Sequence, residues 1–426
     1  MFSTKVLRIL HTFIIFAKSV EYMKQILLDR QGYSERIERM FGKGMVVALT
    51  GQRRVGKSCI MRCIYEKYAK DSHNNVIYID MEKTTFADIL NYKDLEQYIV
   101  ARLDTSKDNY LFIDEVQEIQ DFEKAILSLQ SDESCQIMVT GSNAKMLSSE
   151  LSTRLRGRYI GYHIHGLDYE EFIEFHNLHD SDETLNQFLQ YGGLPQLRQL
   201  GLENTDLVND YLENVVNTIV LRDIIERENI RNVPLLRTLI RFIGNNIGKQ
   251  FSARSIVGVL KSQNTEASTN MVLNYLEYLC NAYIINRVNR YNIHGKKIFE
   301  MGDSFYFEDL GLRNHIVGGN RNFDIEKVME NVVYQHLLRL GYTVYIGMLY
   351  KAEIDFVAEK QGSTIYIQVC YMLASEDTIE REFGNLRMIK DSHPKYVVSM
   401  DRMYGDTNID GIKHLHLRDF LKKQEL

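Results

Sequence analysis

Short apolar runs rich in β-branched residues recur along the first part of the chain, and segments with helical spacing separate them. The runs are Met45–Thr50, Val76–Asp80, Tyr110–Ile113, Gln136–Thr140 and Ile160–Ile164. Between them, segments such as Ile60–Tyr68 and Phe122–Leu129 place apolar residues on one face of a helix. Continuous apolar strands that alternate with helices are typical of a parallel sheet covered on both faces. The pattern therefore predicts an α/β fold with a doubly wound parallel sheet.

The remainder of the chain has a different pattern. Helical spacing prevails from Tyr169 to about Asn246. Two later runs, Ile284–Tyr291 and Lys297–Phe307, are predicted to pair as strands. The last part of the chain mixes both element types, in the order helix near Ile325–Leu340, strands near Tyr342, Ile354 and Ile365, helix near Glu376–Lys390, and strand at Tyr396–Ser399.

Length and composition describe an ordinary globular protein. The 426 residues suggest two or three domains at ~150 residues each, and 45% hydrophobic with 25% charged residues supply ample core material. The net charge of −6 gives no overall attraction for nucleic acid, so such binding would need a local basic patch. The cysteines form no CxxC pair, which fits a reducing cytosol, and we expect a cytoplasmic protein.

The N-terminus superficially imitates a signal peptide, because Lys5 and Arg8 accompany the apolar segment Ile9–Ala17. That segment lacks a convincing cleavage site and is much shorter than the ~20 residues that span a bilayer. We therefore expect residues 1–22 to be a non-structural extension, with Met23 as the natural translation start, and we expect no membrane association.

A phosphate-binding loop follows the first apolar run. It has the pattern GxxxxGK[ST] and consists of Gly51, Gln52, Arg53, Arg54, Val55, Gly56, Lys57 and Ser58. Its glycines let backbone N–H groups curl around a phosphate, and the helix that begins near Cys59 adds partial positive charge. We expect Lys57 to reach the β- and γ-phosphates and Ser58 to ligate Mg²⁺. A chance match is the alternative, but the preceding strand and following helix favour a P-loop for ATP at residues 51–59.

Two carboxylates, Asp114 and Glu115, directly follow the run Tyr110–Ile113. In a doubly wound sheet the carboxyl end of a strand faces the ligand crevice. Asp114 is therefore predicted to hold Mg²⁺ through water, and Glu115 to act as a general base on an attacking water. Asp-Glu pairs after strands are also common on surfaces, but the spacing from the P-loop favours a catalytic pair, and the glutamate favours hydrolysis.

A helix predicted over Asn143–Gly157 carries leucines along one stripe. On a period of 3.6 residues, Arg154 and Arg158 fall on this stripe, whereas Arg156 points away. Arginines on an apolar face are unusual, so Arg154 and Arg158 are candidates for stabilising transition-state charge. Structural salt bridges are an equally weighted alternative.

Five segments carry a resemblance to a known family: GQRRVGKS at 51–58, LFIDEVQEI at 111–119, VTGSNAKML at 139–147, LRGRY at 155–159 and YGGLP at 191–195. They resemble bacterial and archaeal AAA+-superfamily ATPases that join an AAA domain to a winged-helix region and a restriction-endonuclease-like C-terminal domain. The resemblance extends from Met23 to nearly the end of the chain. It implies that Ser142 or Asn143 touches the γ-phosphate or the attacking water, and that Gly193 and Pro195 contact the nucleotide base. A helix N-cap at 142–143 and a simple turn at GGLP are the alternatives.

These patterns together predict the domain organisation. We expect a P-loop NTPase sheet, a helical lid, a winged-helix region and a small restriction-endonuclease-like α/β domain. The corresponding ranges are 1–22 for the extension, 23–168 for the ATPase domain, 169–234 for the lid, 235–318 for the winged-helix-like region and 319–426 for the last domain.

The winged-helix region has a weak basic signature. Phe251–Leu260 and Ser268–Ala282 fit a helix-turn-helix followed by a strand pair. The second helix begins with polar but uncharged residues, namely Ser268, Thr269 and Asn270. Cations suited to phosphate contacts lie in the wing, namely Arg287, Arg290, Lys296 and Lys297. DNA binding through this wing is one expectation, and use of the region for packing or protein contact is favoured over it.

The C-terminal domain departs from the nuclease motif that its resemblance implies. Glu330 and Asp355 match the helix glutamate and strand aspartate of that motif. Gln368 and Cys370 replace the acid and the lysine of the third element, which removes a hard-metal ligand and a positive charge. We therefore expect a degenerate domain without nuclease activity.

The leading hypothesis is a Mg²⁺-dependent ATPase whose nucleotide state controls C-terminal interaction domains. The alternatives are an ATP-loaded protein-binding switch with negligible turnover and an ATP-regulated nuclease acting on DNA. We expect a protein partner of unknown identity, and the chain is a candidate homo-oligomer.

Overall fold

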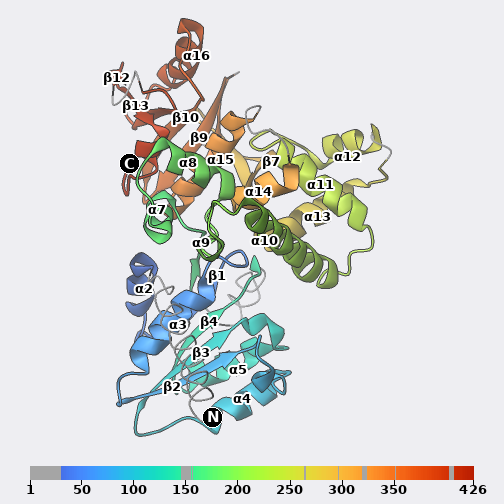
Figure 1. Ribbon diagram of the computed structural model, residues 1–426, viewed down its shortest axis with the longest axis vertical. Coiled ribbons are helices and arrows are strands. Elements are labelled where there is room, and N and C mark those ends of the chain that lie inside the picture. Colours follow the sequence, from blue (N-terminus) through green and yellow to red (C-terminus); the bar gives the residue numbers. More distant parts are fainter. Residues whose placement is uncertain are drawn as a thin grey trace, which may run out of the picture. The chain divides into compact units, whose positions relative to one another are not determined.

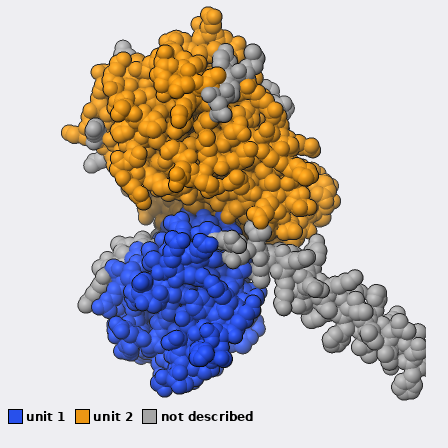
Figure 2. Space-filling view, turned by 90° about the vertical axis from the view of Figure 1, so that its left-hand side faces the viewer, with its two compact units in different colours: residues 1–51, 56–164 blue, residues 52–55, 165–426 orange. Residues whose placement is uncertain are grey.

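The computed structural model describes residues 30–144, 155, 157–262, 265–295, 297–318, 324–350, 352–402 and 407–426. They form two compact units, coloured blue and orange in Figure 2. Unit 1 comprises the described residues of 1–51 and 56–164, and unit 2 comprises those of 52–55 and 165–426. Residues 52–55, the middle of the P-loop, thus belong to unit 2, although their neighbours along the chain belong to unit 1.

Unit 1 contains a five-stranded sheet in the order β2-β3-β4-β1-β5. Its strands are β1 (Val46–Thr50), β2 (Asn74–Asp80), β3 (Asp108–Asp114), β4 (Gln136–Thr140) and β5 (Tyr159–His163). All neighbouring strands run parallel, which confirms the predicted parallel sheet. The carboxyl ends of all five strands therefore lie along one edge (Figure 1).

Helices cover both faces of this sheet. The helical elements of unit 1 are α2 (Gln31–Glu38), α3 (Lys57–Tyr68), η1 (Thr84–Phe86), α4 (Tyr92–Val100), η2 (Val116–Glu118) and α5 (Phe122–Ser131). Leu111 and Ile113 of β3 belong to a buried cluster with residues of α4 and α5. Phe112, which points to the opposite face, meets Tyr65 of α3 edge-on, with ring centroids 6.0 Å apart. Apolar residues at successive strand positions are thus buried on two faces, which explains the continuous apolar runs.

Unit 2 begins with a helical region, as the periodicity after Tyr169 predicts. Its helices up to the first strand are α7 (Tyr169–His176), α8 (Asp182–Tyr191), α9 (Leu197–Leu200), α10 (Thr205–Thr218), the π-helix η4 (Ile219–Glu226), α11 (Val233–Asn245), α12 (Ala253–Ser262) and α13 (Thr269–Asn281). Later helices are α14 (Leu310–Val317), α15 (Ile325–Arg339), α16 (Glu376–Arg387) and α17 (Leu417–Phe420).

One eight-stranded sheet runs through unit 2 in the order β12-β13-β11-β10-β9-β8-β6-β7. The strands are β6 (Ile285–Asn292), β7 (Lys297–Phe307), β8 (Thr343–Leu349), β9 (Ala352–Lys360), β10 (Ser363–Val369), β11 (Lys395–Ser399), β12 (Asn408–Ile409) and β13 (Ile412–His416). β6 and β7 form the predicted strand pair, which is antiparallel. β6 also pairs parallel with β8, where Tyr291 lies opposite Gly347. The sheet therefore continues across the domain boundary expected at residues 318 and 319.

The C-terminal part of this sheet has its own core. Phe383 and Leu386 of α16 are fully buried, in a cluster with Ile354, Val357 and Val397 of the sheet. Their burial fixes the helix predicted near Glu376–Lys390 on the sheet. Among helices in the described ranges, none combines the length and apolar character needed to cross a membrane.

Candidate nucleotide site

The glycines of the P-loop are required by its backbone. Gly51 has a φ of 138°, and a Cβ added there would lie 2.2 Å from the carbonyl oxygen of Ile164. Gly56 has a φ of 100° and directly precedes α3. L-residues with a side chain rarely adopt these angles. The loop therefore leaves β1 and enters α3 in a shape that only glycine at both ends permits.

Lys57 and Ser58 lie in the first turn of α3, beside the strand-end carboxylate. Lys57 is buried, and its Nζ donates a hydrogen bond to the carbonyl oxygen of Gly51 at 2.9 Å. Ser58 Oγ donates to Asp114 Oδ1 at 3.0 Å. The Thr140 hydroxyl, at the end of β4, contacts the same carboxylate oxygen. Burial raises the pKa of Asp114, and the hydrogen bonds from Thr140 and Ser58 act against that rise.

Glu115 adopts a left-handed backbone conformation immediately after β3, with a φ of 53°. Its N–H donates to Thr140 Oγ1 at 2.9 Å, and its buried carboxylate contacts the side-chain amide of Gln117. Non-glycine residues held in this conformation concentrate at functional sites. Thr140 therefore links Asp114 and Glu115, and the structure brings both predicted carboxylates to the P-loop edge of the sheet.

Ser142 and Asn143 lie at the same edge. Gly141 N–H donates to Leu49 O at 2.9 Å, which places the end of β4 beside the end of β1, where the P-loop begins. Both Ser142 and Asn143 are buried. Within the described part of the chain, the buried Ser142 Oγ has no hydrogen-bond partner. A buried hydroxyl with open bonding capacity at this edge fits a phosphate or water contact. The helix expected to start at Asn143 lies mostly outside the described residues.

The other loop residues are divided between the interior and the surface. Val55 is fully buried, whereas the side chains of Arg54 and Cys59 are exposed. Gln52 and Arg53 are buried in contacts within unit 2. Sequence reasoning assigned all of these residues to phosphate binding and did not anticipate that partition.

The predicted arginine stripe is described only at Arg158. Arg154 and Arg156 lie outside the described residues. Arg158 immediately precedes β5 and is exposed, and its carbonyl oxygen accepts a hydrogen bond from Val46 N–H at 3.0 Å. Val46 begins β1, whereas the P-loop follows its end. Arg158 therefore lies at the sheet edge opposite the P-loop, because β1 and β5 run parallel.

Gly193 and Pro195 lie in a turn of unit 2. Gly193 N–H donates to Asp309 Oδ2 at 2.9 Å, and its carbonyl oxygen accepts from Leu167 N–H at 2.7 Å. A Cβ on Gly193 would lie 2.3 Å from Leu167 O. Burial raises the pKa of Asp309 to about 6. These contacts explain the paired glycines as a packing requirement, and the expected contact of Gly193 and Pro195 with a nucleotide base stays a prediction.

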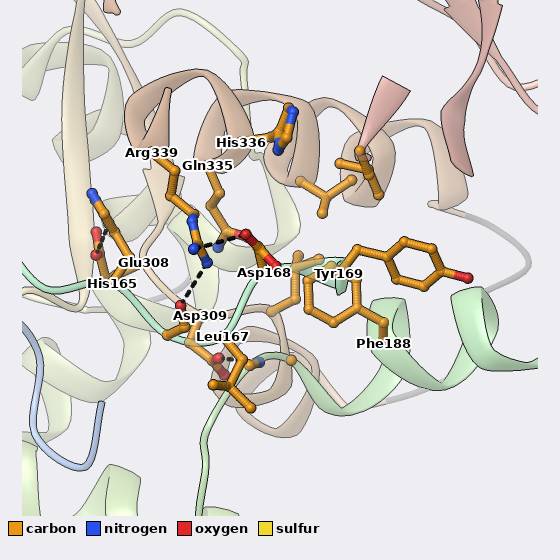
Figure 3. A pocket seen from close by; sticks show the side chains of 16 residues that line it. His165, Leu167, Asp168, Tyr169, Phe188, Glu308, Asp309, Gln335, His336 and Arg339 are labelled. Carbon is orange, nitrogen blue, oxygen red and sulfur yellow. Dashed lines mark hydrogen bonds and ion pairs between the residues drawn. The ribbon is translucent and has the colours of Figure 1, made fainter. Parts of the chain in front are cut away.

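A pocket lies beside this turn and is drawn in Figure 3. Several charged and polar side chains that line it pair with one another. Arg339 points toward Asp168, with Nη2 and Oδ2 2.8 Å apart. His165 Nδ1 lies 2.7 Å from Glu308 Oε1. The ion pair and the histidine contact join α15, the start of α7 and the end of β7 into one packed region.

The second carboxylate pair lies in unit 2. Asp355 Oδ2 accepts a hydrogen bond from Val369 N–H at 2.7 Å, and Glu330 Oε2 accepts from the Tyr306 hydroxyl at 3.3 Å. Burial raises the pKa of both carboxyls, and the charge of Glu330 raises that of Asp355 further. Both carboxyls are half-buried, and their raised pKa values favour the protonated forms. Gln368 and Cys370, the departures from the nuclease motif, are buried.

Two of the cations predicted in the wing lie beside carboxylates. Arg287 Nε lies 3.4 Å from Asp303 Oδ2, and Arg290 Nη2 lies 3.4 Å from Glu353 Oε2. Lys297 is exposed, and Lys296 lies outside the described residues. Ser268, predicted at the start of the second helix, caps α13 by accepting from Met271 N–H.

Two residues of the site escaped sequence reasoning. Thr140 contacts Asp114 and Glu115, and Asp80 lies opposite Asp114 at the end of β2. Both are the last residues of predicted strands. Their position at the strand ends could have indicated both residues. This signal is useful only when the strand order is known, and the sequence does not specify that order.

Sequence comparisons identify the class of domain in unit 1. Residues 43–173 match the family profile described as the AAA domain. Residues 182–322 match a domain of unknown function, DUF8612. Over 407 residues the chain is 29% identical to an uncharacterised protein of Haemophilus influenzae, covering 94% of this chain and 100% of the relative. It is also 29% identical over 391 residues to the uncharacterised protein MJ1544 of Methanocaldococcus jannaschii, covering 87% and 86%.

A structural comparison agrees on the fold. The Walker-type ATPase of Pyrococcus abyssi superposes with a TM-score of 0.50 at 15% identity, covering 68% of this chain and 95% of the other. Together with the parallel sheet and the AAA match, this similarity defines a P-loop NTPase fold. The winged-helix and restriction-endonuclease-like identities of the later regions stay predictions.

Proposed function

We propose that the chain binds ATP with Mg²⁺ at residues 51–59 and hydrolyses it. The observation that carries the proposal is the convergence on Asp114 of two hydroxyls, from Ser58 and Thr140, beside the buried Glu115. A hydroxyl and a carboxylate at a P-loop are the ligand types that magnesium takes in this fold. The unpartnered Ser142 hydroxyl, among the described residues, adds a polar group suited to a phosphate.

Each residue has a distinct part in nucleotide binding. The backbone N–H groups between Gly51 and Gly56 cradle a phosphate, and the N-terminus of α3 adds partial positive charge. Lys57 releases the Gly51 carbonyl and donates to the β- and γ-phosphates. Ser58 and Asp114 hold Mg²⁺, which when bound neutralises charge on the phosphate oxygens.

Hydrolysis requires a base beside the γ-phosphate. Glu115 takes a proton from the attacking water, and its left-handed backbone turns the residue away from the strand direction of β3. Thr140 holds that turn through the Glu115 N–H. Ser142 or Asn143 positions the water or the γ-phosphate. An arginine acting in trans from another copy of the chain is compatible with the far-edge position of Arg158.

The nucleotide state is proposed to control protein contacts made by unit 2. A protein partner is favoured over DNA because Arg287 and Arg290 already face carboxylates of their own unit. Nuclease activity is disfavoured, because Gln368 and Cys370 supply neither the acid nor the lysine of the motif.

One assay tests the proposed activity. Release of phosphate from ATP is measured with Mg²⁺, with EDTA, and with added duplex DNA, single-stranded DNA or RNA. We expect turnover to depend on Mg²⁺. Added nucleic acid should change the turnover rate by less than about twofold, because Arg287 and Arg290 of the wing already lie beside carboxylates. Nucleotide binding without turnover would favour the ATP-loaded switch, and absence of binding would overturn the proposal.

A further inference from the structure

The middle of the P-loop is held by two contacts within unit 2. Arg53 donates two hydrogen bonds to Asp223, from Nε to Oδ2 at 2.6 Å and from Nη2 to Oδ1 at 2.8 Å. Gln52 Nε2 donates to the carbonyl oxygen of Tyr283 at 2.8 Å. All four residues are buried. A planar two-bond pairing of this kind fixes both distance and orientation.

The partners of the loop lie where the backbone is irregular. Asp223 belongs to the π-helix η4, which continues α10, and π-helical turns occur frequently at functional sites. Tyr283 lies between α13 and β6 and has a φ of 54°. An aromatic residue in the left-handed region is strained and persists only where surrounding contacts hold it. Both contacts thus end on segments whose backbone departs from regular α-helix or strand geometry.

We propose that Arg53 and Asp223 are positioning residues that link nucleotide binding in the P-loop to the π-helix η4 and to the turn at Tyr283. This inference rests on the proposed ATP-binding function and names how nucleotide state reaches unit 2. Lys57 must leave the Gly51 carbonyl to reach a phosphate, which removes one contact that holds the loop backbone and frees it to adjust around the nucleotide. A movement of Arg53 is transmitted to Asp223, because the two hydrogen bonds of the ion pair allow little rotation of one side chain relative to the other.

Linkage requires the reverse effect as well. If nucleotide alters the conformation of η4 through Arg53, then the state of η4 alters nucleotide affinity by the same factor. Asp223→Asn removes the charge and one acceptor while keeping the side-chain volume. The variant is expected to bind ATP, because Lys57, Ser58 and Asp114 remain, but with the link to unit 2 weakened.

Hydrogen exchange measured by mass spectrometry on the full chain tests the link. Exchange of peptides covering 219–226 and 282–286 is compared with and without AMPPNP plus Mg²⁺. We expect the analogue to change exchange at least ~5-fold in the unsubstituted chain, the lower end of usual coupling. In Asp223→Asn that change should fall to less than half, at analogue concentrations that saturate each protein.

Two further variants separate coupling from folding. Asp324→Asn removes a carboxylate from another interior arginine of unit 2, Arg313, and is expected to respond as the unsubstituted chain does. The double variant Arg53→Met with Asp223→Met replaces the buried pair by apolar side chains, a change that is often neutral for folding. It should fold and lose the response at 219–226 when the analogue is added at a concentration that saturates this variant, whatever its affinity.

The outcomes distinguish this inference from the proposed function. Failure of the unsubstituted chain to bind AMPPNP would overturn both. Binding without a change at 219–226 and 282–286, or an equal change in Asp223→Asn, would overturn the coupling alone and leave ATP binding intact. A matching loss of response in Asp324→Asn would show a general effect of unpaired arginines and would also overturn it.

Discussion

Each of the two units holds a pair of interacting acidic residues, and the surroundings of the two pairs differ in kind. Asp114 in unit 1 meets two hydroxyls, and the P-loop lysine lies on the same helix turn as one of them. Asp355 in unit 2 accepts a backbone N–H, and Glu330 meets a tyrosine hydroxyl. Asp114 is buried and Asp355 is half-buried, and burial raises the pKa of each.

The difference teaches that the neighbours of a carboxylate pair decide whether the pair suits the proposed magnesium site. In unit 1 the hydroxyl hydrogen bonds favour the charged form of Asp114 against burial. In unit 2 the charge of Glu330 disfavours the charged form of Asp355. In both units the net shift of the aspartate pKa is upward, so the feature that suits the first pair to the proposed cation is the two hydroxyls beside Asp114.

The largest expected effect lies at Glu115. Glu115→Gln should keep nucleotide binding and lose ~10²-fold or more in ATP turnover, the usual scale for a removed general base. Single-turnover kinetics with a parallel binding measurement separates the two effects. Glu118→Gln is the matched control, because Glu118 is exposed and lies in the same 3₁₀ segment, η2. Turnover of Glu115→Gln at the parent rate would falsify the assignment of the base.

Loss of the P-loop cation ranks next. Lys57→Ala should weaken ATP binding ~10- to 100-fold, since hydrogen bonds to charged groups contribute about 1.5–3 kcal/mol. Titration with a fluorescent ATP analogue measures the affinity. Lys67→Ala, on the exposed side of the same helix and paired with Glu38, should bind as the parent does. Equal affinities for the two variants would contradict the proposed site.

The carboxylate pair of unit 2 predicts a pH dependence of stability. Burial raises the pKa of Glu330 from 4.5 to about 8, so the folded state keeps a proton that the unfolded chain has released. The resulting stabilisation is complete below about pH 4.5 and is lost as the pH rises toward 8. Glu330→Gln cannot lose a proton, and its free energy of unfolding should fall less over this range.

Urea unfolding of both proteins between pH 5 and 8 measures that difference, with the largest gap in favour of the variant expected at the upper end. Glu376→Gln, an exposed glutamate at the start of α16, is the control. Parallel pH profiles for parent and Glu330→Gln would show that the pair is already ionised. The contrast between the two carboxylate centres would then be wrong.

The sequence predicted the elements better than their arrangement. The parallel sheet followed from apolar runs, because strands buried on both faces have no polar side. The contact of Thr140 with Asp114 did not, because it depends on β4 lying beside β3. The pairing of β6 with β8 likewise joins segments that are remote along the chain, and no local signal marks it.

The same reasoning explains which site residues were found. Contiguous sequence motifs contain Lys57, Ser58, Asp114 and Glu115. The spacing within these motifs is enough to predict the proposed role of each residue. Arg53 matched a variable position of the P-loop pattern, and its pairing with the distant Asp223 depends on tertiary structure.

The smallest expected effect separates the two edges of the unit 1 sheet. The helical stripe predicted that Arg158 acts on the transition state, but its carbonyl oxygen binds Val46 at the start of β1, whereas the P-loop follows the end of that strand. Five residues of a strand at ~3.3 Å each separate these edges by ~16 Å, beyond the reach of an arginine side chain. Arg158→Ala should therefore change turnover less than about twofold at protein concentrations that keep the chain monomeric. A loss that appears only as the protein concentration rises would instead assign Arg158 to the nucleotide site of a neighbouring copy, and a large loss in the monomer would contradict the position of β5.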